Sequence, residues 1–236
     1  MRKIIVMNSK GGCGKSTIAT NLASSYSTRG FRTALFDHDP QGSSMTWLRL
    51  RDSGDEIHGV AAHQSAGPNM TRTWQLRTPP DIQRVILDTP ASLPEPELIR
   101  LVHNIDVILI PVLPSPIDIH ATADFIRDLL LTGRIRHQST RIGIIANRVR
   151  SNTRAYQKLE RFLNQLDIPL IARLRDTQYY LQAVEKGCGI GDIGEAATRP
   201  DRKDWDEILD WLEVEPRKPK TASDDASLAD AAAQVC

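Results

Sequence analysis

Short, nearly continuous apolar runs recur along the chain and alternate with longer amphipathic stretches. Runs such as IIVM, VILI and IGII are typical of parallel strands that are buried on both faces of a sheet. They predict strands over residues 3–8, 32–37, 57–63, 84–88, 106–111, 141–147 and 169–172. The stretches between them predict helices over residues 15–28, 43–51, 95–102, 117–131, 153–166, 177–186 and 204–212. This alternation predicts an α/β fold, a doubly wound and mostly parallel sheet with helices on both faces.

The length and the composition fit one folded domain followed by a polar tail. The chain has 236 residues, of which 40% are hydrophobic, and this suits a single α/β domain. From about residue 215 the composition changes to Pro, Lys, Ser, Asp and Ala, so we expect a domain over 1–214 and a disordered tail over 215–236. No apolar run has the roughly 18–20 residues of a membrane span, and no secretory signal pattern is found. Three cysteines without a CxxC pair complete the expectation of a cytoplasmic protein.

A glycine-rich loop follows the first predicted strand and leads directly into the first predicted helix. Its residues are Lys10, Gly11, Gly12, Cys13, Gly14, Lys15, Ser16 and Thr17. Glycines let successive backbone N–H groups point at phosphate oxygens, and the helix N-terminus adds partial positive charge. Strand, loop and helix in this order predict a P-loop that binds a nucleotide. In such a loop Lys15 reaches the β- and γ-phosphates, Ser16 binds Mg²⁺ and Thr17 contacts the α-phosphate. Cys13 occupies a variable position of the loop, and no activating partner for a catalytic thiol is indicated.

The loop resembles the deviant Walker A motif of the ParA/MinD family of positioning ATPases, and in particular the small plasmid-type ParA proteins. The distinguishing residue is the second lysine, Lys10, at the start of the loop. The resemblance covers about residues 1–213 and implies an ATPase with slow basal turnover that a partner protein stimulates. It also implies an ATP-dependent homodimer, in which Lys10 reaches the nucleotide of the other subunit and neutralises phosphate charge. The alternative for Lys10 is a solvated loop lysine.

Carboxylates follow two of the predicted strands. Asp37 and Asp39 lie in the segment DHDPQG, and Asp88 ends the strand over 84–88. These segments resemble the DxDPQG and Walker B motifs of the family. The resemblance implies that Asp39 orients the attacking water and that Asp37 helps to hold the Mg²⁺ shell. It also implies that Asp88 bonds to magnesium through water or to Ser16. The alternative for Asp37 and Asp39 is an acidic turn after a strand.

Two further strand ends predict contacts with the base of the nucleotide. Pro111 and Pro114 belong to a segment that resembles the family motif PxxPSPxD, with Asp118 in place. Asn147 ends another strand, and its amide offers a donor and an acceptor that match the edge of adenine. The resemblance implies that Asn147 contacts adenine while the proline loop packs on the base. Because the guanine-specific motif NKxD is not found, the predicted ligands are ATP and Mg²⁺. The proline loop also suits a rigid turn that positions the next helix.

Positive charge is concentrated in one part of an almost neutral chain. The net charge is +1, whereas residues 132–175 hold ten basic and two acidic residues, a net charge of +8. Helical spacing places Arg154, Lys158 and Arg161 on one face, which suits contacts with DNA phosphates. The candidate DNA contacts are Arg148, Arg150, Arg154, Lys158, Arg161, Arg173 and Arg175. Since no helix-turn-helix or aromatic RNA-binding motif is found, we expect sequence-independent binding of double-stranded DNA. The alternative is a solvated basic face.

These features, taken with the resemblance, predict a positioning ATPase that binds nucleoid DNA as an ATP dimer. A ParB-like or other cargo-bound adaptor would stimulate hydrolysis and release it, so that a plasmid, a chromosome locus or a protein organelle such as a carboxysome is segregated or spaced. One alternative is a MinD-like membrane positioner, which residues 222–236 disfavour because they are small and acidic rather than amphipathic. Another is a relative such as dethiobiotin synthetase or the nitrogenase iron protein, and the latter would need paired cysteines.

Overall fold

The computed structural model describes residues 1–52, 56–65, 71, 75–132, 140–150, 153–166, 168–194 and 196–214. In these ranges a seven-stranded parallel sheet has the order β3-β2-β4-β1-β5-β6-β7. The strands are β1 (Arg2–Val6), β2 (Thr33–Asp37), β3 (Ile57–Ala61), β4 (Arg84–Asp88), β5 (Val107–Val112), β6 (Arg141–Val149) and β7 (Leu170–Arg175). The helices are α1 (Lys15–Thr28), α2 (Ser43–Leu50), α4 (Glu95–Val102), α5 (Pro116–Thr132), α6 (Arg154–Leu163), α7 (Tyr179–Glu185) and α8 (Arg199–Glu213), with 3-10 turns η2 (Ile190–Asp192) and η3 (Ala196–Thr198). The predicted doubly wound parallel fold is confirmed.

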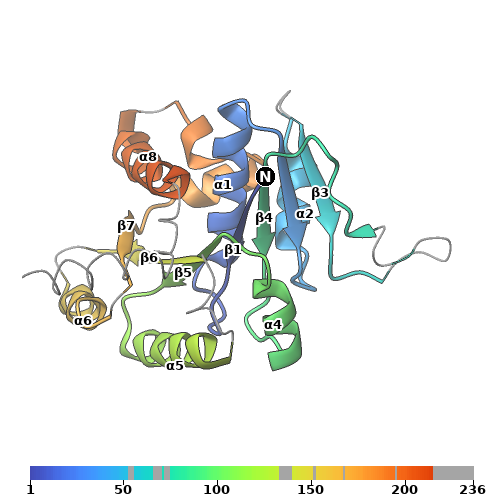
Figure 1. The fold of residues 1–236 in the computed structure, drawn as a ribbon. Helices are drawn as coiled ribbons and strands as arrows, with labels where there is room; N and C mark the ends of the chain where they lie inside the picture. The colour runs from blue at the N-terminus through green and yellow to red at the C-terminus, as the bar shows by residue number, and fades with distance from the viewer. Residues whose placement is uncertain are drawn as a thin grey trace, which may run out of the picture.

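Helices cover both faces of the sheet (Figure 1). Helices α1, α2, α7 and α8 pack on one face, and α4, α5 and α6 pack on the other. The central strand β1 contributes to both cores, because Ile4 and Val6 point into the first and Ile5 points into the second. Burial on both faces explains why the strand sequences are continuous apolar runs. No helix within the described ranges is both long and apolar enough to cross a membrane.

The carboxyl ends of the parallel strands lie at one edge of the sheet. β1 lies between β4 and β5; β2 and β3 lie on the β4 side, β4 returns to the place between β2 and β1, and β5, β6 and β7 follow in order on the other side. In open sheets of this kind ligands bind outside the carboxyl ends, at the point where the strand order reverses. The loops that follow β1, β2, β4, β5 and β6 therefore meet at this edge.

Some element bounds differ from the predicted ones. β7 continues to Arg175, because this outer strand alternates buried Ala172 and Leu174 with more exposed arginines instead of forming one apolar run. α8 begins at Arg199, five residues earlier than predicted, because Pro200 is compatible with the first turn of a helix. α6 ends at Leu163, and the next residues form i to i+3 turns. The predicted tail, residues 215–236, lies outside the described residues, as do Arg134, Arg136 and Asp167 of the basic segment.

Candidate nucleotide and magnesium site

The loop between β1 and α1 has a backbone that requires glycine. Gly12 and Gly14 have φ angles of 75° and 97°, in the left-handed region. A Cβ at Gly14 would lie 2.1 Å from Nδ2 of Asn147, so a side chain is excluded there for a second reason. Gly14 is also the N-cap of α1 and offers no side chain to the first-turn N–H groups. This leaves the helix N-terminus suited to a phosphate.

The two lysines of the loop have different surroundings. Lys15 is only 7% exposed, and its Nζ donates a hydrogen bond to the backbone carbonyl of Lys10 at 3.0 Å. The Cys13 thiol donates to the same carbonyl at 3.2 Å, and its Sγ lies 4.0 Å from Nζ of Lys15. Burial raises the pKa of the Cys13 thiol, which favours the protonated and unreactive form. The Lys15 ammonium is thus held inside the loop, whereas Lys10 is partly exposed at its rim.

Asp88 ends β4 directly beneath this loop. Its side chain is completely buried, and Oδ2 accepts a hydrogen bond from the Ser44 hydroxyl at 2.5 Å. Burial raises the pKa of Asp88 to about 6, while the hydroxyls of Ser44 and Ser16 oppose this rise. Oδ1 is buried with no hydrogen-bond partner in the part of the chain that the structure describes. A free carboxylate oxygen beside a P-loop serine fits a hydrated Mg²⁺ ion, which prefers oxygen ligands and keeps several waters.

Asp37 and Asp39 differ in how their carboxylates are used. Asp37 is fully buried, and its two oxygens accept hydrogen bonds from the backbone N–H groups of Asp39 and Met45, at 3.0 and 3.1 Å. Burial raises the pKa of Asp37, and these two N–H donors oppose the rise. Asp39 is half-buried, and its Oδ1 accepts from the N–H of Gln41 at 2.9 Å. Asp37 thus fixes the turn, and Asp39 is the more accessible carboxylate.

Two asparagine side chains connect β5 and β6 to the segment that contains the phosphate loop, and the predicted strand end at Asn147 lies within β6, which continues to Val149. Asn147 is 5% exposed; its Nδ2 donates to the carbonyl of Cys13 at 2.8 Å, and its Oδ1 accepts from the N–H of Arg148 at 2.9 Å. Asn8 donates from Nδ2 to the carbonyl of Pro111 at 2.7 Å. Pro114 is partly buried in the same proline loop. The amide of Asn147 therefore supports the phosphate loop directly, and Pro111 is held next to it through Asn8.

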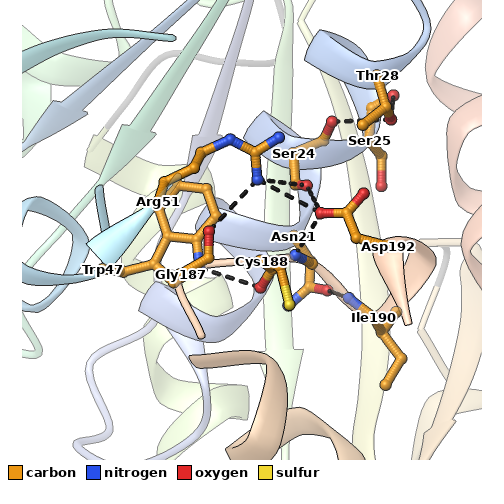
Figure 2. A network of polar contacts seen from close by, with 11 residues as sticks. Asn21, Ser24, Ser25, Thr28, Trp47, Arg51, Gly187, Cys188, Ile190 and Asp192 are labelled. Carbon is orange, nitrogen blue, oxygen red and sulfur yellow. Dashed lines mark hydrogen bonds and ion pairs between the residues drawn. The ribbon is translucent and has the colours of Figure 1, made fainter. Parts of the chain in front are cut away.

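The helix that follows the acidic turn is fixed at both ends. At its start Ser44 bonds to Asp88, as described above. Near its end Nε1 of Trp47 donates to the carbonyl of Cys188 at 3.1 Å, and Nη1 of Arg51 donates to the hydroxyl of Ser24 at 3.0 Å (Figure 2). Arg51 also forms an ion pair with Asp192 at 3.4 Å. α2 thus connects the acidic turn to α1 and to the segment between α7 and α8.

Comparison with known proteins identifies the family. Residues 4–188 match the CobQ/CobB/MinD/ParA nucleotide binding domain. The chain belongs to this family. The maintenance of carboxysome distribution protein A of Halothiobacillus neapolitanus is 29% identical over 192 residues, which are 81% of this chain and 87% of that protein. The resemblance that the loop carries is therefore confirmed.

Solved structures share the fold of this ParA/MinD-type domain. A putative plasmid partition protein of Borrelia burgdorferi bound to AMPPNP has a TM-score of 0.66 at 16% identity, and the match covers 89% of this chain and 98% of that one. An aspartate-to-alanine variant of Cyanothece McdA in complex with ATP has a TM-score of 0.60 at 17% identity, with 89% and 96% covered. These matches show that the sheet and its helices have the family arrangement.

Sequence reasoning missed two polar residues of the ParA/MinD-type site. Asn8 lies two residues before the glycine-rich loop, and its position at the end of the predicted first strand was a signal that could have found it. Ser44 had no such signal, because its partner Asp88 lies 44 positions further along the chain. Both side chains are buried, at 2% and 0% exposure. Both act on the site from the protein interior, through hydrogen bonds to Pro111 and Asp88.

The basic residues of the domain fall into two groups. Arg154, Lys158 and Arg161 are exposed on α6, opposite the buried Tyr156 and Leu159. The other candidates have carboxylate partners. Arg148 and Arg150 pair with Asp176, Arg173 pairs with Glu160, and Arg175 pairs with the fully buried Asp201. Ion pairs lower the positive potential around the second group. The exposed residues Arg154, Lys158 and Arg161, which we call the α6 stripe, therefore have the stronger positive potential.

Proposed function

We propose that this chain is an ATP-dependent positioning ATPase. The observation that carries the proposal is the buried carboxylate of Asp88, which interacts with Ser16 of a phosphate loop with two lysines and has one oxygen without a hydrogen-bond partner among the described residues. Lys15, Thr17 and the N–H groups of Gly11, Cys13 and Gly14 bind the phosphates. Ser16 and Asp88 hold Mg²⁺, and Asp37 supports this shell through the turn that it fixes. Magnesium, when bound, neutralises phosphate charge.

Hydrolysis is slow in the isolated protein and depends on a second subunit. Asp39 is the carboxylate best placed to orient water, because it is half-buried and its turn is fixed by Asp37. Lys10 lies at the partly exposed rim of the loop and neutralises the nucleotide of the other subunit in a homodimer. Asn147 contacts adenine, and the proline loop with Pro111 and Pro114 packs on the base. Binding of ATP therefore controls formation of the homodimer as well as hydrolysis.

The dimer binds double-stranded DNA without sequence preference, and it is thereby held on the nucleoid in the cytoplasm. Arg154, Lys158 and Arg161 make the principal phosphate contacts, because these exposed side chains form one stripe on α6. The paired arginines add weaker contacts. Dimerisation doubles the stripe, so affinity rises through avidity when ATP is bound.

A cargo-bound adaptor of ParB-like or other type stimulates hydrolysis and releases the protein from DNA. The relative from Halothiobacillus is a protein for carboxysome distribution, and the one from Borrelia is a putative plasmid partition protein. The higher sequence similarity of the first favours a protein organelle as the cargo, with a plasmid or chromosome locus as the alternative.

The proposal is tested by binding of random-sequence duplex DNA at low and moderate salt, with ATP·Mg²⁺, with ADP·Mg²⁺ and without nucleotide. We expect salt-sensitive binding that requires ATP. Equal binding in all three states would overturn nucleotide control. No binding in any state, together with normal ATP hydrolysis, would overturn the nucleoid function and leave an ATPase with another task.

A further inference from the structure

Ser44 connects the helix after the acidic turn to the carboxylate at the end of β4. It is the second residue of α2, is completely buried, and donates from its hydroxyl to Oδ2 of Asp88 at 2.5 Å. A hydrogen bond from a hydroxyl to a buried carboxylate at this distance is of the strong, charge-assisted kind. The contact joins the two segments that surround the magnesium site.

This hydrogen bond decides which oxygen of Asp88 is available. Ser44 occupies Oδ2, and Oδ1 has no partner in the described part of the chain. The terminal torsion of an aspartate side chain has a broad preference, so the backbone alone does not fix the plane of the carboxylate. Ser44 supplies the missing constraint.

Ser44 is itself held in place by its neighbours on both sides. The N–H of Met45 donates to Oδ2 of Asp37 at 3.1 Å, and the N–H of Thr46 donates to the carbonyl of Gly42 at 2.9 Å. The far end of α2 is fixed by Trp47 and Cys188. The hydroxyl therefore has a defined position before any ligand binds, as an orienting group requires.

We infer that Ser44 is a positioning residue for magnesium. It fixes the carboxylate of Asp88 through Oδ2, so that Oδ1 stays available for the Mg²⁺ that Asp88 and Ser16 would hold. The inference rests on the proposed function, in which Asp88 and Ser16 hold Mg²⁺. The Ser44 hydroxyl bonds to Asp88 and not to a backbone or side chain of the phosphate loop in the hydrogen bonds of the described residues, so it sets the affinity for metal and leaves metal-free nucleotide affinity unchanged. Partners that orient a metal ligand typically change metal affinity by about 10–100-fold.

The test measures the Mg²⁺ concentration that gives half-maximal binding of a fluorescent ATP analogue. We compare the wild type with Ser44→Ala and Ser44→Cys, which keep the small size and remove the strong donor. Ser43→Ala is the matched control, because Ser43 is the exposed neighbour on the same helix. Affinity for the analogue in EDTA, binding of Mn²⁺ by electron paramagnetic resonance and thermal unfolding are measured on the same samples.

We expect both Ser44 variants to need about 10-fold more Mg²⁺ and to bind Mn²⁺ more weakly. Affinity in EDTA should match the wild type, and Ser43→Ala should behave as the wild type throughout. An unchanged Mg²⁺ requirement, or an equal loss of affinity in EDTA, would overturn the inference alone. A wild-type protein that binds the analogue without any Mg²⁺ dependence would overturn the proposed site and this inference together.

Discussion

The side-chain amide of Asn147 donates a hydrogen bond to the backbone carbonyl of Cys13 at 2.8 Å, across 134 positions of sequence. The same amide lies against Gly14, where a Cβ would be 2.1 Å from Nδ2. The phosphate loop and the end of β6 therefore determine each other's shape. This arrangement gives Asn147 a structural task beside the base contact that the resemblance implies.

Replacing Asn147 by alanine separates these two tasks. The variant leaves the carbonyl of Cys13 without its donor, so we expect a loss of about 1–3 kcal/mol in unfolding free energy, measured with urea. Affinity should be measured for ATP and for inorganic triphosphate, which lacks the base. An equal loss for both ligands indicates support of the loop, and a loss confined to ATP indicates base contact. No loss for either ligand would contradict both tasks.

Replacing Lys15 and replacing Lys10 should impair different properties of the protein. Lys15→Ala removes the charge that lies inside the loop, and we expect ATP affinity to fall about 100-fold or more in calorimetry. Lys10→Ala should keep ATP binding but lose the ATP-dependent dimer and hydrolysis, as measured by light scattering and phosphate release. A Lys10→Ala protein that dimerises and turns over normally would rule out its action on a second subunit.

Asp39→Ala should preserve ATP binding and trap the ATP-bound dimer. Only the orientation of water is lost, so we expect hydrolysis to fall by about 10²–10⁴-fold in a phosphate-release assay. Asp37→Ala provides the contrast, because it removes the acceptor of two backbone N–H groups and should lower the unfolding temperature. Full activity of Asp39→Ala would show that another group orients the water.

The α6 stripe should control DNA affinity with little effect on folding. In a triple alanine variant of Arg154, Lys158 and Arg161, about three phosphate contacts are lost in each subunit and about six in the dimer, so the slope of log K against log salt should fall by about five. The control removes the same charge elsewhere through alanine at Arg49, Lys186 and Lys203. Unchanged DNA binding in the triple variant would place the contact on another surface.

Arg175→Ala should instead destabilise the fold by about 2 kcal/mol, because it leaves the buried carboxylate of Asp201 without its partner.

Stability should depend on pH through Asp204 of α8. Burial, together with Glu207 and Asp201, raises the pKa of Asp204 to about 6 from 3.8. The folded state therefore holds a proton that the unfolded state releases, and stability falls as the pH rises from about 4 to 6. Asp204→Asn removes this penalty, so it should stabilise the protein by about 1 kcal/mol above pH 7, after allowance for solvent screening, and not below pH 4.

The control for this pH dependence is Asp210→Asn, an exposed position on the same helix, which should show no such change. Unfolding by urea at pH 4, 6 and 8 gives the comparison. A gain that is equal at all pH values would point to a change of helix propensity instead of a shifted carboxyl.

Sequence patterns were sufficient where the determinant of structure is local. The bounds of α1, α4 and β4 agree with the prediction, because the apolar runs and glycine turns that set them lie in the same few residues. The end of β7 at Arg175 depends instead on its place at the sheet edge, and α8 begins before the predicted apolar face because Pro200 is compatible with its first turn. Long-range contacts such as Ser44 with Asp88 leave no periodic trace, so only coordinates show them.

Helix α2 has eight residues, so its two fixed ends lie only about 12 Å apart. A helix of this length bends and stretches very little. We therefore expect a rotation of the acidic turn to be passed on to the backbone around Gly187 and Cys188, which α2 contacts. Because Gly187 touches the backbone of Leu50 and Arg51 too closely for any side chain, the two segments move as one mechanical unit.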